Sequence, residues 1–105
     1  MAYKTIRTSI RTDSNTPFFE DSANLTEVTN YINTNFRDTG KLVSKNIVLD
    51  ADQTMCHTTV IWSSKQAWED FFSDAYLTEN FFIASKQYES ENAIFSVFSG
   101  EDVPN

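Results

Sequence analysis

Residues 42–62 read LVSKNIVLDADQTMCHTTVIW, and this stretch decides the fold. Two segments rich in β-branched residues, 42–49 and 54–62, flank a short polar turn at 50–53. Such segments are typical of strands, and a turn this short joins antiparallel neighbours. The stretch therefore predicts a β-hairpin in the middle of the chain.

A helix is expected on each side of this hairpin. Before it, apolar residues recur at helical spacing from Asn24 onward, and Gly40 suits the end of that helix because it tolerates positive φ. After it, Ser63 or Ser64 is expected to cap a second helix. The apolar pattern of this second helix stutters near 74–80, which predicts an interruption there.

The outer segments complete the order of elements. Residues 4–12 alternate along the chain, and residues 93–98 read AIFSVF, so each predicts a strand. Residues 13–23 are expected to form a loop, and the polar end from residue 99 a loose tail. The order β-α-β-β-α-β predicts an α+β, ferredoxin-like fold in one domain, 1–105: a four-stranded antiparallel sheet with both helices on one face.

Composition excludes several classes of site. A net charge of −7 argues against nucleic acid and anionic membranes as partners. Two Gly are too few for a phosphate-binding loop. One Cys excludes an internal disulfide and a Cys-based zinc site, and one His excludes sites that need two. We therefore expect no cofactor and no metal. No apolar segment has the length of a secretion signal or a membrane span, so the expected location is cytoplasmic.

The second face of the sheet also bears on assembly. Alternation in strands 54–62 and 93–98 places apolar side chains on both faces, although two helices cover only one. The expected solution is a homodimer packed sheet against sheet. The alternative is a monomer in which the loop 13–23 folds over the second face.

The passage from the third strand into the second helix carries a family resemblance. The segment WSSKQAWEDF, residues 62–71, resembles the corresponding passage of the dimeric α/β-barrel superfamily, the antibiotic-biosynthesis-monooxygenase-like proteins. Some members degrade haem with an Asn on the first strand, a Trp in the second helix and a His about ten residues later. Here the first strand has no Asn, and Phe71 and Phe81 fall at the other two positions. The resemblance therefore implies the fold and argues against haem degradation.

His57 is the candidate catalytic residue, because its side chain alone in this chain has an unperturbed pKa near neutrality. It could act as a general base if its strand face lines an interior; a structural, hydrogen-bonded His is the alternative. Cys56 points to the opposite face, so the two cannot form a nucleophile pair within one subunit.

Arg7, Arg11 and Trp62 are the candidate ligand-binding residues. The two Arg share a face of the first strand, which neighbours the third strand in this fold, so with His57 they could form a patch for an anionic or carbonyl-bearing ligand. Salt bridges to a partner subunit are the alternative. Trp62 is one of several aromatic residues in and around the second helix. These residues are expected to form core or dimer contacts, and the alternative is that they form the wall of an apolar pocket.

Two functions remain open from the sequence. The favoured one is a ligand-binding or assembly module with a small aromatic or anionic ligand. The alternative is a cofactor-independent, monooxygenase-like enzyme acting on an aromatic or polyketide-type molecule. A pocket containing His57 would favour the enzyme.

Overall fold

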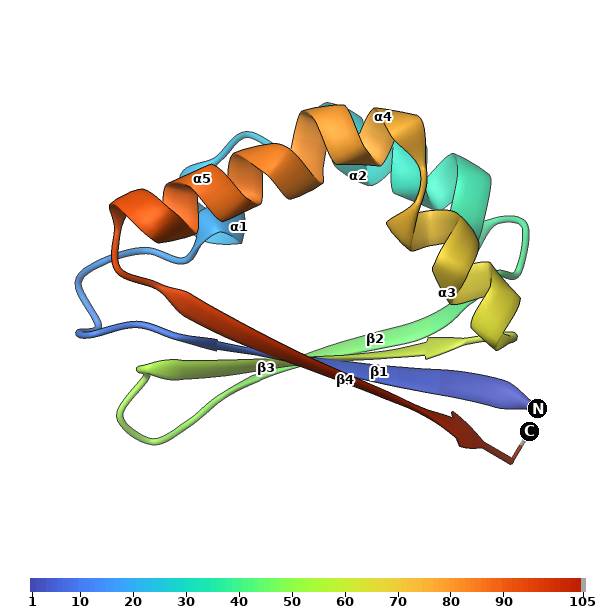
Figure 1. The fold of residues 1–105 in the computed structure, drawn as a ribbon, viewed down its shortest axis with the longest axis horizontal. Coiled ribbons are helices and arrows are strands. Elements are labelled where there is room, and N and C mark those ends of the chain that lie inside the picture. The colour runs from blue at the N-terminus through green and yellow to red at the C-terminus, as the bar shows by residue number, and fades with distance from the viewer. Residues whose placement is uncertain (105) are drawn as a thin grey trace.

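The computed structural model describes residues 1–104. Its strands and helices, including two π-helical turns η1 and η2, run in the order β1 (Ala2–Ile10), α1 (Phe19–Ser22), α2 (Thr26–Ile32), η1 (Asn33–Arg37), β2 (Leu42–Leu49), β3 (Met55–Trp62), α3 (Lys65–Phe72), α4 (Ala75–Leu77), η2 (Thr78–Phe82), α5 (Ile83–Glu91) and β4 (Phe95–Val103). The strands form one antiparallel sheet in the order β2-β3-β1-β4. The helices arch over one face of this sheet (Figure 1). This arrangement confirms the predicted fold class.

The central hairpin agrees with the prediction almost residue for residue. Its turn is held by Asp50, whose Oδ1 accepts from the backbone N–H groups of Thr54 and Met55 at 3.0 and 3.1 Å. Gln53 takes a positive φ of 61° in this turn. The hairpin places β2 at one edge of the sheet and β3 inside it.

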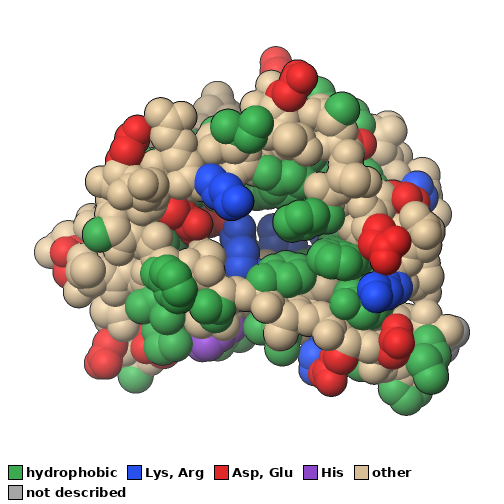
Figure 2. Space-filling view, in the orientation of Figure 1, with side chains coloured by type: hydrophobic (Ala, Val, Ile, Leu, Met, Phe, Trp, Pro, Cys, Tyr) green, Lys and Arg blue, Asp and Glu red, His purple; other side chains and the backbone are tan. Residues whose placement is uncertain are grey.

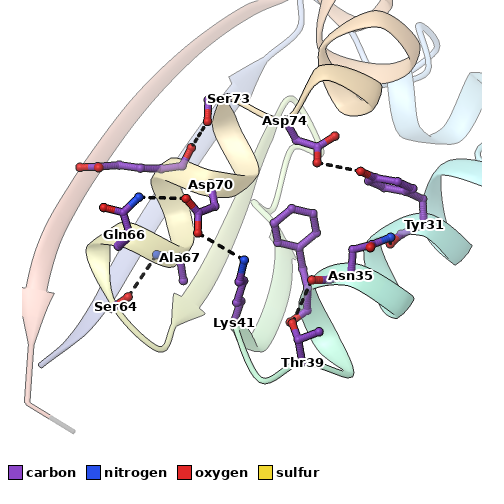
Figure 3. Close-up of polar contacts among 12 residues, drawn as sticks. Tyr31, Asn35, Thr39, Lys41, Ser64, Gln66, Ala67, Asp70, Ser73 and Asp74 are labelled. Carbon is purple, nitrogen blue, oxygen red and sulfur yellow. Dashed lines mark hydrogen bonds and ion pairs between the residues drawn. The ribbon is translucent and has the colours of Figure 1, made fainter.

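The second helical region is interrupted where the pattern stutters. Ser64, and not Ser63, caps α3 by accepting from the Ala67 N–H (Figure 3). The helix ends at Phe72, and Asp74 begins α4 by accepting from the Leu77 N–H at 3.0 Å. The same carboxylate accepts from the Tyr31 hydroxyl of α2 at 2.7 Å, so the break also ties the two helical regions together (Figure 3).

Two expectations about the irregular segments are wrong. The polar end is not loose, because residues 99–103 continue β4 and pair with residues 2–6 of β1. Backbone hydrogen bonds to a central strand stabilise this segment whatever its side chains. The segment 13–23 is not all loop, because it contains α1. It packs against the helical layer, where the Phe19 ring contacts the rings of Phe81 and Tyr88, so the alternative in which it covers the second face does not hold.

The core lies between the sheet and the helical arch. Its buried members are Tyr3, Val28, Phe36, Leu42, Trp62, Ala67 and Leu77. The Tyr3 ring crosses directly over Gly100 of β4, where a Cβ would lie 2.3 Å from the tyrosine oxygen. No helix within residues 1–104 is both long and apolar enough to cross a membrane.

Candidate functional site: an aromatic pocket with a charged end

A cavity of about 230 Å³ lies between the inner, helix-facing side of the sheet and the helical arch. Figure 2 shows it as a hollow walled by hydrophobic side chains, with Lys and Arg side chains at its back. Strand alternation explains its floor, because cross-strand partners share one face. Arg7 pairs with Thr58 and Phe98, and Thr5 pairs with Val60, so these side chains all point inward.

Aromatic rings form most of the wall. They come from β3, α3, η2 and β4: Trp62, Trp68, Phe71, Phe72, Phe81, Phe82 and Phe98. Trp62 and Phe71 lie 4.9 Å apart between ring centroids, and Trp68 stacks on Phe98 at 5.8 Å. Phe72 and Phe98 remain 56% and 49% exposed, so the aromatic wall extends to the opening of the cavity.

Trp62 is fixed deep in this wall. Its side chain is only 2% exposed, and its Nε1–H donates to Thr5 Oγ1 at 2.9 Å. Both partners are buried, so the indole orientation is set within the protein. The ligand-binding role of Trp62 stays a prediction, and its place in the cavity wall supports it.

The other end of the cavity carries charge. Arg7 forms an ion pair with Glu20 of α1, and Arg37 and Lys45 also line the cavity. Lys45 lies on the edge strand β2, so part of its side chain stays in water. Desolvation of its ammonium by surrounding protein lowers its pKa; the Glu20 carboxylate raises that pKa, and the nearby Arg7 and Arg37 lower it.

The two predicted arginines have different roles in the structure. Arg7 lines the cavity, whereas Arg11 lies beyond its end. The Arg11 guanidinium donates to the carbonyls of Gln53 and Thr16 at 2.8 and 2.7 Å and lies over the Phe18 ring. This set of contacts holds the segment before α1 against the hairpin turn.

The expectation that His57 shares a patch with the two arginines is wrong. His57 pairs with Thr8, and Arg7 is next to Thr8 along β1, so neighbouring residues point to opposite faces of the sheet. The His57 Nδ1 is 3.0 Å from Thr8 Oγ1 on the outer face. Cys56 points to the face opposite His57, as expected, and this is the inner face, where burial raises the pKa of its thiol.

Sequence reasoning missed Glu20, Arg37 and Lys45. A signal existed for Lys45, because it is the one charged residue in the otherwise apolar and neutral strand segment 42–49. Glu20 and Arg37 gave no such signal, since each lies among other polar residues. Within residues 1–104, no group of three or more His, Cys, Asp or Glu is placed to hold a metal ion.

The outer face of the sheet carries exposed apolar side chains among polar ones. Across its centre run Val48, His57, Thr8 and Val97, one from each strand. Phe95 flanks this row and is 64% exposed, and Val97 is 47% exposed. Figure 1 shows no described helix over this face.

Solved structures of other proteins share this fold. No family model and no curated protein matches the chain. A dimeric ferredoxin-like protein from an uncultured marine organism aligns over 100% of this chain and 96% of its own, with 17% identity and a TM-score of 0.68. A monooxygenase from Streptomyces coelicolor, solved with the ligand nanaomycin D, aligns over 98% and 89%, with 15% identity and a TM-score of 0.66. The chain has the ferredoxin-like fold of these proteins.

A third structure extends the same likeness. A candidate antibiotic biosynthesis monooxygenase from Caulobacter crescentus covers 98% of this chain with 91% of its own, at 10% identity and a TM-score of 0.65. These structures confirm, at the level of the fold, the resemblance seen in residues 62–71. At such identities the likeness does not extend to activity.

Proposed function

We propose that this protein binds a small aromatic molecule in the cavity between the sheet and the helices. The aromatic wall is the observation that carries this proposal, since rings in a concave site recognise apolar, planar ligands. The cavity of about 230 Å³ is below the usual range of about 300–1,000 Å³, so it suits a ligand of one or two rings.

The alternative is a cofactor-independent, monooxygenase-like enzyme acting on an aromatic or polyketide-type molecule. The fold shared with a monooxygenase that was solved with nanaomycin D favours it. The cavity's own residues favour binding instead. Its titratable lining consists of Arg7, Glu20, Arg37 and Lys45, and Glu20 is engaged by Arg7. The general base predicted from the sequence, His57, lies on the other face of the sheet.

Both tryptophans of the chain line the cavity, which gives a direct test. We expect a two-ring neutral aromatic such as 2-naphthamide to shift both indole N–H signals in an NMR titration. Phe98→Ser should weaken this binding by removing part of the wall. Ile83→Ser is the matched control, because Ile83 is similarly exposed but lies outside the cavity. Unchanged indole signals at saturating ligand would contradict the proposal.

We also propose that a second copy of this chain covers the outer face of the sheet. Exposed apolar side chains lie on that face, and its charged pair Lys4–Glu101 lies toward one end. One protein of the same fold is described as dimeric. A two-fold axis would bring this face against its own copy and remove Phe95 and Val97 from water.

Sedimentation equilibrium tests this assembly. We expect about twice the chain mass of 12.0 kDa at micromolar concentration. Phe95→Asp should give the monomer mass, because it places a charge in the proposed interface. Phe72→Asp alters a comparably exposed ring at the cavity opening and should leave the dimer intact. A monomeric wild-type protein would refute the proposed dimer.

A further inference from the structure

Positive charge is concentrated at the cavity in a way that the overall composition does not explain. The chain has 8 Lys and Arg against 15 Asp and Glu, yet three of the cations and only one of the carboxylates line the cavity. An acidic protein that keeps its cations at one concave site offers a local anion-binding environment there.

Two of these cations have no carboxylate partner in the part of the chain that the structure describes. Glu20 is paired with Arg7, whereas neither Arg37 nor Lys45 has a carboxylate within 4.0 Å among residues 1–104. Desolvation of the Lys45 ammonium by surrounding protein lowers its pKa, and the Glu20 carboxylate opposes this shift only in part. An anion bound beside Arg37 and Lys45 would offset it.

The cavity has two chemically different sides. Lys45 comes from β2 and Arg37 from η1 beside it, while Phe98 comes from β4 and contacts Phe72 of α3. Strands β2 and β4 are the opposite edges of the sheet. A ligand that spans the floor of the cavity therefore meets rings at one edge and cations at the other.

We propose that the ligand of this cavity is an aromatic acid, with its rings against the aromatic wall and its carboxylate between Arg37 and Lys45. This inference rests on the proposed aromatic-binding function and specifies the class of ligand. Arg37 can bind a carboxylate through two parallel N–H donors, and Lys45 adds a mobile ammonium. The size of the cavity limits the acid to one or two rings.

A pair of matched probes tests the acidic group separately from the rings. 2-Naphthoate and 2-naphthamide have the same ring system and nearly the same size, but only the first is charged. By isothermal titration calorimetry we expect 2-naphthoate to bind about tenfold to a hundredfold more tightly. The double variant Arg37→Gln, Lys45→Gln should lower naphthoate affinity to that of the amide and leave amide binding unchanged.

The control removes the same charge elsewhere. Lys65→Gln, Lys86→Gln changes two lysines outside the cavity and should keep the naphthoate preference. Equal affinity of the two probes for the wild-type protein would overturn the acid site while leaving the aromatic pocket in place. A preference that both double variants abolish equally would also overturn it, as a long-range charge effect. Failure of both probes to bind would instead remove the aromatic-binding function itself.

Discussion

The hydrogen bond between Thr5 and Trp62 gives the sharpest test of the packing beneath the cavity. Thr5→Val replaces the hydroxyl by a methyl of similar shape and keeps a β-branched residue in β1. The change leaves Trp62 Nε1–H without its 2.9 Å partner. Thr5 is 3% and Trp62 2% exposed, so water is a poor substitute for the lost acceptor.

The expected cost follows from this burial. A buried donor left unsatisfied costs about 1–3 kcal/mol. In a domain near this size each kcal/mol lowers Tm by about 4 °C, so the variant should melt about 4–12 °C below the wild type. Measurements should be made at one protein concentration, because a dimer makes Tm depend on concentration.

A control separates the hydrogen bond from simple repacking. Thr5→Ser keeps the acceptor and loses one methyl, which costs about 0.8 kcal/mol. The Trp62 indole N–H should therefore exchange slowly with solvent in the wild type and in Thr5→Ser, and faster in Thr5→Val. A Thr5→Val protein with wild-type Tm and unchanged indole exchange would refute the reasoning.

Three further outcomes are expected. Gly100→Ala should destabilise the fold by about 1–3 kcal/mol in chemical denaturation, because the new methyl meets the buried Tyr3 ring; wild-type stability would show that the ring moves aside freely. The Asp70 carboxylate accepts from the Gln66 amide, and this hydrogen bond lowers the pKa of Asp70 below 3.8. Asp70 should therefore stabilise the fold fully above its pKa in the unfolded chain, and this contribution should fade as pH falls through its lower pKa in the folded protein. An acid-unfolding midpoint for Asp70→Asn equal to that of the wild type would contradict this. Alkylation of Cys56 by iodoacetamide at pH 8 should be slower than that of a free cysteine, because burial raises its pKa; equal rates would contradict it.

The hairpin shows what local sequence can specify. Strand periodicity and a four-residue turn are short-range features, so residues 42–62 could be assigned almost to the residue. The break near Asp74 was also visible, because a cap residue interrupts the helical pattern there. The strand at the C-terminal end could not be predicted from the local sequence, since residues 99–103 become a strand only through pairing with β1.

The sequence by itself determined the order of the elements, the neighbouring positions of the first and third strands, and the opposite orientations of Cys56 and His57. These features follow from the alternation of side chains along each strand and from the order of the elements, both of which can be read from neighbouring residues. Only the tertiary structure decided which face of the sheet the helices cover. Because the helices cover the opposite face, His57 lies away from the cavity. Glu20, Arg37 and Lys45 line it instead, from three separate elements. The physical reason is that a cavity forms where separate elements pack against one another. Residues that meet there are far apart along the chain, so their meeting leaves no periodic pattern in the sequence.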